Sequence, residues 1–307
     1  MSKLCLGARG AMMQHHQHHG FHPSTVLVLF VLLCRSTFSW NPADTDHPCT
    51  IPRVTVNHFG PHGLPSLYPS PVILLLSQQE EAFSKDASRK SYKEIIRRTE
   101  RDGILAWFGN DFAVTLSSSN AISEHRRTVP LSTYLEEIHS TSTESTNSTA
   151  LVPANETWYL FGETHSSEWI EFLQPYPLPP CRSCDDHRVT LSFGIGNQGS
   201  GVQWHTHGPG FSETLHGRKH WMLLPPSSTP PPGYHKDQSS RQWMEDVYPM
   251  YDSSNGTFAS DQSKRIWECT LYPGEAIYFP DRWWHATINL EPYTAFISTF
   301  TTEYDEL

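Results

Sequence analysis

Residues Gly274–Glu291 have the sequence GEAIYFPDRWWHATINLE. The segment starts with a turn and continues as a strand of alternating character. It then bends at Pro280 and returns as a second strand that carries His285. Short strands separated by tight turns are typical of barrels and jelly rolls, which bring together residues that lie far apart in sequence. The segment therefore predicts a β-barrel with a histidine on one of its strands.

A second histidine segment, residues 205–226, has the sequence HTHGPGFSETLHGRKHWMLLPP. If this segment is extended, His205 and His207 point to the same side of the strand and can hold one metal ion. A His-x-His pair is weak evidence by itself, because surface histidines reach this spacing by chance. A third histidine on a distant strand, His285, turns the pair into a candidate three-ligand metal site.

The rest of the chain also favours a mainly β fold. An amphipathic pattern predicts a helix over residues 91–101 that Gly103 stops, and a second helix over 131–139. The apolar run at residues 71–76 predicts a buried strand. Further strands are expected at residues 157–161, 189–195, 219–224, 266–272, 276–279 and 294–300. We therefore predict a barrel or jelly roll with helical decorations at its N-terminus.

The two histidine segments resemble the JmjC domain, the cupin-type double-stranded β-helix of many iron(II)/2-oxoglutarate oxygenases. The resemblance rests on GSGVQWHTH with GRKHWMLLPP, followed by GEAIYFPDRWWHATINLE, and is strongest to small members that consist of the JmjC domain alone. It extends over roughly residues 49–302. It implies an N-terminal decoration over 40–150 and a barrel core over 151–302. An insertion over 225–262 carries a short helix near 242–247.

The resemblance also implies a cofactor site. In the JmjC family the metal-binding strand has the pattern His-x-Asp/Glu, and a second histidine lies on a later strand. His205 and His285 match the two histidines, and His207 stands at the carboxylate position. Lys219 matches the lysine that pairs with the far carboxylate of 2-oxoglutarate. Asn289 and Ser298 lie near further polar positions, so the implied cofactors are iron(II) and 2-oxoglutarate.

Three hypotheses account for His207. Three imidazoles could hold iron, in a centre that is one charge unit more positive than usual. Alternatively, Glu213 could supply the carboxylate, as in the older cupin pattern of three histidines and a glutamate that binds manganese or iron. Finally, the site could be degenerate and the fold could act as a binding scaffold. Val202 fits this last hypothesis, because relatives often have a threonine hydroxyl there.

The first 39 residues have the pattern of a signal peptide. Lys3 and Arg9 form a positive start, residues 26–33 form the apolar core, and residues 37–39 form a small-x-small cleavage site. The apolar core is too short to span a bilayer comfortably. The terminal residues 304–307, YDEL, resemble the retrieval signal of the endoplasmic reticulum. We therefore expect a protein of the endoplasmic reticulum lumen that is not an integral membrane protein after processing.

Sequons and cysteines agree with this compartment. Three glycosylation sequons occur, at Asn147, Asn155 and Asn255. Four cysteines remain after processing, and an even number in an oxidising compartment favours disulfides, although sequence does not assign the pairing. They are Cys49, Cys181, Cys184 and Cys269. The pair at 181 and 184 leaves a redox role or a zinc half-site open, but a redox pair would need a helix there, whereas a strand-like run follows.

The net charge of the chain restricts the classes of partner that it is expected to bind. The net charge is −10 and becomes −13 when the three cations of residues 1–39 are removed. This balance gives no support for nucleic-acid binding. We expect a protein substrate or protein partner in the secretory pathway, with oligomerisation left open. The function expected is that of a metal-dependent protein hydroxylase that uses 2-oxoglutarate. The alternatives are a catalytically degenerate scaffold and a thiol–disulfide protein.

Overall fold

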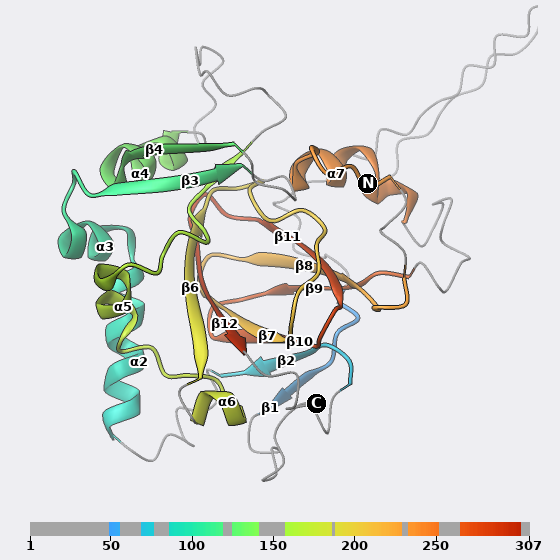
Figure 1. Ribbon diagram of the computed structural model, residues 1–307, viewed down its shortest axis with the longest axis horizontal. Coiled ribbons are helices and arrows are strands. Elements are labelled where there is room, and N and C mark those ends of the chain that lie inside the picture. The colour runs from blue at the N-terminus through green and yellow to red at the C-terminus, as the bar shows by residue number, and fades with distance from the viewer. Residues whose placement is uncertain are drawn as a thin grey trace, which may run out of the picture. The chain divides into compact units, whose positions relative to one another are not determined.

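Two curved β-sheets face each other in the computed structural model and form a double-stranded β-helix (Figure 1). The fold predicted from the sequence is therefore confirmed. The structure describes the following residues, all within the unit Phe38–Leu307: 49–55, 69–76, 86–118, 125–140, 157–185, 188–228, 233–251 and 265–301. Among these residues, no helix is long and apolar enough to cross a membrane.

The larger sheet has six strands in the order β1-β2-β10-β7-β12-β6. The strands β1 and β2 pair in parallel, and the other neighbours are antiparallel. Their bounds are β1 Arg53–Thr55, β2 Val72–Leu75, β6 Val189–Gly196, β7 Gly210–His216, β10 Glu275–Phe279 and β12 Thr294–Thr301. The first two strands come from the part that the sequence assigned to the N-terminal decoration, so this part contributes directly to the barrel sheet.

The smaller sheet of the barrel has the order β11-β8-β9, with bounds β8 Lys219–Leu224, β9 Trp267–Leu271 and β11 Trp284–Asn289. Alternation along β8 separates its two faces. Trp221 and Leu223 pack between the sheets with Ile277 and Phe279 of β10. The side chain of Met222 points the other way, into the hydrophobic cluster around Trp243. This alternation places Lys219 on the inner face.

A helical layer covers the outer face of the larger sheet. It contains α2 Asp86–Thr99, α3 Arg101–Phe108, α4 Leu131–Ser140 and α5 Ser167–Leu173, together with a third sheet of β3 Ala113–Ser118, β4 Arg126–Pro130 and β5 Trp158–Tyr159. Figure 1 shows α2, α3 and α5 beside β6. Side chains such as Ile95 and Phe172 pack there against Phe193 and Ile297 of the sheet.

The predicted helix end at Gly103 is wrong. The first helix ends at Thr99, Glu100 is extended (φ −61°, ψ 152°), and Gly103 lies inside α3. A Cβ at this glycine would collide with the carbonyl oxygen of Arg97. Glycine therefore permits the close approach of two consecutive helices instead of ending one. The predicted helix over 131–139 is confirmed as α4.

A further helix covers the outer face of the smaller sheet. This helix is α7 Ser240–Asp246, followed by the short 3-10 turn η3 Tyr248–Met250. The hydroxyl of Ser239 accepts the backbone N–H of Gln242 at 3.1 Å, which caps its start. Trp243 is fully buried against the sheet. The helix expected near 242–247 is thus present and begins slightly earlier.

The strand β7 was not among the expected strands. Its sequence, GFSETLH, follows Gly208 and Pro209 and precedes Gly217, so local signals suggest a turn. In the sheet this strand pairs with both β10 and β12. Central position in the sheet therefore overrides weak local propensity.

Candidate metal centre

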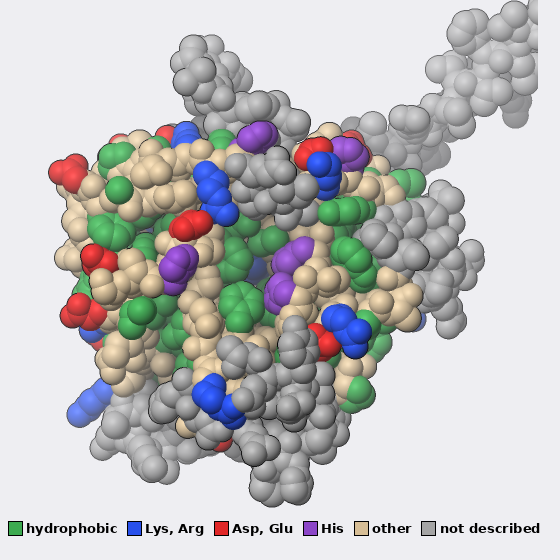
Figure 2. Space-filling view, viewed as in Figure 1, with side chains coloured by type: hydrophobic (Ala, Val, Ile, Leu, Met, Phe, Trp, Pro, Cys, Tyr) green, Lys and Arg blue, Asp and Glu red, His purple; other side chains and the backbone are tan. Residues whose placement is uncertain are grey.

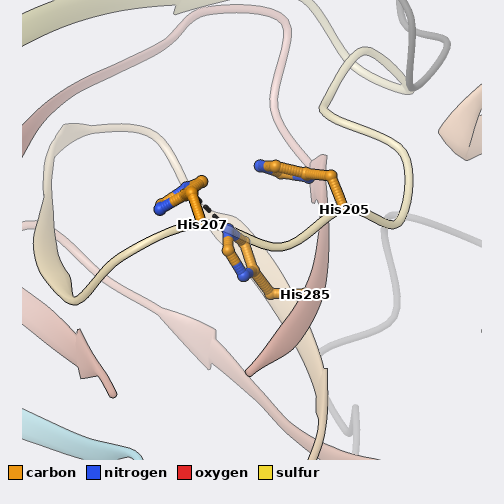
Figure 3. A group of neighbouring side chains, drawn as sticks. All are labelled: His205, His207 and His285. Carbon is orange, nitrogen blue, oxygen red and sulfur yellow. Dashed lines mark hydrogen bonds between the residues drawn. The ribbon is translucent and has the colours of Figure 1, made fainter. Parts of the chain in front are cut away.

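Three histidines meet at one end of the smaller sheet. His285 lies on β11, and its backbone exchanges two hydrogen bonds of 3.0 Å with His205, so the loop that carries His205 is held beside the strand. His207 follows two residues later. One ring nitrogen from each histidine lies within 4.8 Å of the others, and Figure 3 shows the three rings grouped around one point. Residues 203–207 were expected to be extended, but only His205 forms a β-bridge, with His285. This bridge is enough to place the ring of His207 beside that of His285.

Backbone carbonyls orient all three rings. Each Nδ1 lies 2.8 Å from a carbonyl oxygen: that of Gln203 for His205, that of Gly208 for His207, and that of Trp283 for His285. A carbonyl oxygen only accepts, so each Nδ1 carries the proton. The Nε2 atom of each neutral ring therefore presents a lone pair. Fixing the tautomer in this way is what protein metal sites do with ligating histidines.

Two of these lone pairs face each other. The Nε2 atoms of His207 and His285 are 3.1 Å apart (Figure 3). Burial and the neighbouring histidines lower the pKa of His285 well below its usual value. Burial also lowers the pKa of His205 to about 4. A shared proton is therefore disfavoured at neutral pH, and a metal cation would satisfy the facing lone pairs.

Aromatic side chains surround the cluster. The ring of Phe279 stacks on His285 at a centroid distance of 4.9 Å, and Trp221 stacks on it at 5.8 Å. Phe300 lies edge-on to His207 at 5.2 Å. Figure 2 shows histidine side chains near the middle of this face, next to hydrophobic side chains. These side chains shield part of the cluster, and the side chains of His205 and His207 remain partly exposed.

Glu213 does not belong to the cluster. Neighbouring residues of a strand point to opposite faces, and Ser212 contacts Ser298 inside the barrel, so Glu213 points outward. Its two carboxyl oxygens accept hydrogen bonds from the hydroxyls of Tyr92 at 2.7 Å and Tyr176 at 2.8 Å. Its proposed role as a ligand is therefore wrong. The manganese alternative that rested on it loses its support, and among the described residues no carboxylate joins the three histidines.

Lys219 lies fully buried inside the barrel, 1% exposed. Its ammonium donates to Oδ1 of Asn289 at 3.0 Å and lies 3.8 Å from the ring centre of Phe296. No carboxylate of the described residues pairs with it, and burial lowers its pKa to about 7. A buried cation without a counter-ion fits an anionic ligand, since the anion would offset the desolvation of the ammonium.

Other predicted polar residues lie on the same inner surface. Asn289 also donates to the hydroxyl of Ser200 at 3.0 Å, and Ser298 donates to Ser212 at 3.1 Å. Ser298 shares its face of β12 with Phe296, the ring next to Lys219. The structure therefore brings Lys219 and Asn289 into contact and places Ser298 on the facing sheet.

Thr287 is a site residue that sequence reasoning missed. It lies between His285 and Asn289 on the same face of β11, and its hydroxyl accepts the backbone N–H of Val202 at 3.1 Å. A hydroxyl is thus present beside Val202 although this residue has none itself. The alternation in WHATIN could have revealed it, because residues two apart on a strand share a face.

The four cysteines form two disulfides. Cys49 pairs with Cys269, and Cys181 pairs with Cys184. The short helix α6 Arg182–Asp185 begins directly after Cys181 and contains Cys184, so a helix that the sequence did not predict begins at this pair. The expected strand follows it as β6. In this state neither pair offers thiolates to zinc. The sequons, the signal-peptide segment and the terminal YDEL lie outside the described residues.

The sheets and the histidine cluster define a cupin-type barrel with a candidate metal centre. The chain matches the family described as cupin-like domain over residues 75–304. It is 41% identical to JmjC domain-containing protein 8 of Rattus norvegicus over 201 residues, 65% of this chain and 67% of that protein. The human protein of the same name is 41% identical over 200 residues, 65% of this chain and 68% of that protein.

A more distant relative is the lysine-specific demethylase JMJ21 of Arabidopsis thaliana. It is 33% identical over 150 residues, which are 44% of this chain and 14% of that protein. The chain therefore belongs to the cupin-like family of JmjC domains. Members of this family generally use iron(II) and 2-oxoglutarate.

Proposed function

We propose that the protein is a JmjC-fold metalloenzyme that hydroxylates polypeptide side chains and uses iron(II) and 2-oxoglutarate. One observation carries this proposal: the unprotonated Nε2 atoms of His207 and His285 lie 3.1 Å apart in a partly buried site. Two facing lone pairs repel unless a cation lies between them or beside them. His205 would supply the third imidazole.

The residues of the chain have separable tasks in this proposal. The carbonyls of Gln203, Gly208 and Trp283 hold the imidazoles in the ligating tautomer. Lys219, oriented by Asn289, would bind the far carboxylate of 2-oxoglutarate through a charge-assisted hydrogen bond. Iron bound at the histidines would supply oxygen activation coupled to decarboxylation of the cosubstrate. Phe279 and Trp221 stack on His285 and shield this ligand from bulk water.

We further propose that the protein acts in the lumen of the endoplasmic reticulum. Two disulfides support an oxidising compartment. The signal-peptide pattern and the net charge of −10 point to a secretory protein that does not bind nucleic acid. The relatives named as demethylases act on lysine or arginine, which supports a polypeptide side chain as the substrate class.

A scaffold without catalysis is the second candidate. The observation in its favour is that His207 replaces the carboxylate, so the centre would lack the negative charge that helps to retain iron(II). An acidic protein with the same fold could bind partner proteins through its surface. The two candidates differ in whether iron(II) and 2-oxoglutarate bind together.

An anaerobic titration separates the candidates. The protein without its signal peptide is titrated with iron(II) and 2-oxoglutarate, and the charge-transfer absorption of the chelated cosubstrate is followed. The enzyme hypothesis predicts a saturable band that His285→Ala and Lys219→Ala abolish. His235→Ala, which changes an exposed histidine outside the cluster, is the matched control and should retain the band. A folded protein without a band would refute the enzyme and favour the scaffold.

A further inference from the structure

A second hollow lies on the outer side of the barrel, away from the histidines. It has a volume of about 500 Å³ and lies between α5 and β6. Its lining is mainly apolar and includes Ile170, Leu173, Tyr176, Leu178 and Leu191. None of these residues belongs to the histidine cluster or contacts Lys219. Ile170 is 65% exposed, so a large apolar side chain reaches solvent at the edge of the hollow.

The hollow adjoins an open sheet edge. The strand β6 is the last strand of the larger sheet. On the edge of β6 that faces away from β12, Ile195 exchanges backbone hydrogen bonds of 3.0 and 2.9 Å with Leu160. The backbone N–H and C=O of Phe193 are both bonded to the hydroxyl of Thr164, at 2.9 and 3.3 Å.

The next residue of this alternating series is Leu191. Every second residue of an antiparallel strand directs its N–H and C=O to the same side. The backbone groups of Ile195 and Phe193 point to the edge of β6 that faces away from β12. The backbone N–H and C=O of Leu191 therefore point to this edge as well. Among the described residues no partner bonds them, and Leu191 lines the hollow. Pairing along this edge of β6 therefore stops before Leu191, next to the apolar hollow.

The usual protection of an edge strand is also missing here. Exposed edges normally carry lysine, proline or a bulge that prevents pairing with another chain. Residues 189–196 have the sequence VTLSFGIG, without a charge or a proline. The register with β12 is continuous along the whole strand. This edge is thus suited to accept another strand.

We propose that this edge and hollow, the β6 groove, bind an extended segment of a second polypeptide. The segment adds a strand beside Leu191 through backbone hydrogen bonds and places an apolar side chain in the hollow. Backbone pairing selects an extended chain over a helix or a small molecule, because only an extended chain offers N–H and C=O groups at matching spacing. This proposal does not depend on metal binding.

Acidic side chains beside the hollow indicate which residues should flank the apolar residue of the bound segment. Glu168 and Glu171 are exposed on α5, next to Ile170 of the lining. Glu168 accepts hydrogen bonds from the hydroxyls of Ser166 and Ser167, and among the described residues neither carboxylate has an ion-pair partner. An acidic border favours a bound segment whose apolar residue is followed by lysine or arginine.

The probe is a fluorescein-labelled peptide of alternating threonine and valine with one lysine at each end. Its binding to the full protein without the signal peptide is followed by fluorescence anisotropy. We expect saturable binding that N-methylation of one alternate set of peptide amides abolishes, whereas N-methylation of the other set does not. Replacing the terminal lysines by glutamate should weaken binding. These results would show backbone pairing in a defined register.

Variants locate the binding site on the protein. Ile170→Glu should weaken binding at least about tenfold, and it should not unfold the protein because Ile170 is largely exposed. Tyr272→Glu, at a 41% exposed residue outside the lining, is the matched control and should leave the affinity unchanged. Circular dichroism checks the fold of both variants.

Three outcomes would overturn the proposal. One is the absence of saturable binding by the folded protein. Another is equal binding of both N-methylated peptides, which would show contact without strand addition. The third is a dimer of the protein, seen in sedimentation velocity, that Ile170→Glu dissociates while the peptide does not bind. In that case the edge pairs with a second copy of the same chain.

Discussion

A buried carboxyl group gives a quantitative prediction about stability. Glu213 is 1% exposed and lies between the larger sheet and the helical layer. Burial raises its pKa from 4.5 to about 7, although the hydroxyls of Tyr92 and Tyr176 partly oppose this rise. The native state therefore binds the proton of Glu213 more tightly than the unfolded chain does.

The sign and magnitude follow from linkage. With the pKa raised, the contribution of Glu213 to stability is fully present below pH 4.5. It is lost as the pH rises from 4.5 through about 7. A rise of roughly 2.5 units corresponds to about 3 kcal/mol. In Glu213→Gln this dependence is absent, because the amide does not titrate. The free energy of unfolding of the variant should therefore increase relative to the natural protein by about 3 kcal/mol between pH 4.5 and 8.

Urea denaturation followed by tryptophan fluorescence measures this difference at a series of pH values. The comparison cancels the titration of the buried histidines, which both proteins share. Leu215→Ala, on the same strand and buried in the cluster that includes Tyr176, is a control that lowers stability without removing a titrating group. The free energy of unfolding of Leu215→Ala should be lower than that of the natural protein by the same amount at every pH. If the difference in unfolding free energy between Glu213→Gln and the natural protein is the same at pH 4.5 and pH 8, Glu213 does not have a raised pKa in the native state.

Three further predictions concern the site and the disulfides. His207→Asp should bind iron(II) more tightly, on the order of tenfold, because a carboxylate lowers the charge of the centre; competition with a coloured chelator measures this. Lys219→Met should stabilise the metal-free protein at pH 7 by about 4 kcal/mol, measured by urea denaturation, because burial depresses the ammonium pKa from 10.5 to about 7. This gain should shrink as the pH rises toward 10.5. Replacing Cys49 and Cys269 by serine should cost about 2–5 kcal/mol in the same assay, because the disulfide spans 220 residues.

Much of the fold could be predicted because strand patterns are local. The strand over 219–224 and the helix over 131–139 were found at or within one residue of their bounds. Both have a clear alternation or an amphipathic stripe that their surroundings reinforce. The strand β7 was missed, since glycine, proline and serine around it resemble a turn. Only its two neighbours in the sheet make it a strand.

The candidate site shows the same division. Spacing along a strand was enough to suggest His205 and His207, and a second strand pattern suggested His285. The resemblance to the JmjC domain pointed to Lys219 as a buried cation. The sequence could not decide whether Glu213 is a further metal ligand beside the three histidines. One residue of register decides between the two faces of β7, and register depends on pairing with distant strands.

Local sequence patterns were thus enough to predict the strands of a barrel and the three histidines, and the resemblance to the JmjC domain pointed to Lys219. The strands and the histidine spacing follow from residue types and from periodicity, which act over a few residues. The tertiary structure alone decided three other matters. It paired the cysteines, turned Glu213 to the outer face, and placed Leu191 at an edge of β6 where no other described residue bonds its backbone. Each of these depends on which segments become neighbours, and contacts between distant segments are specified by the packing of the whole chain.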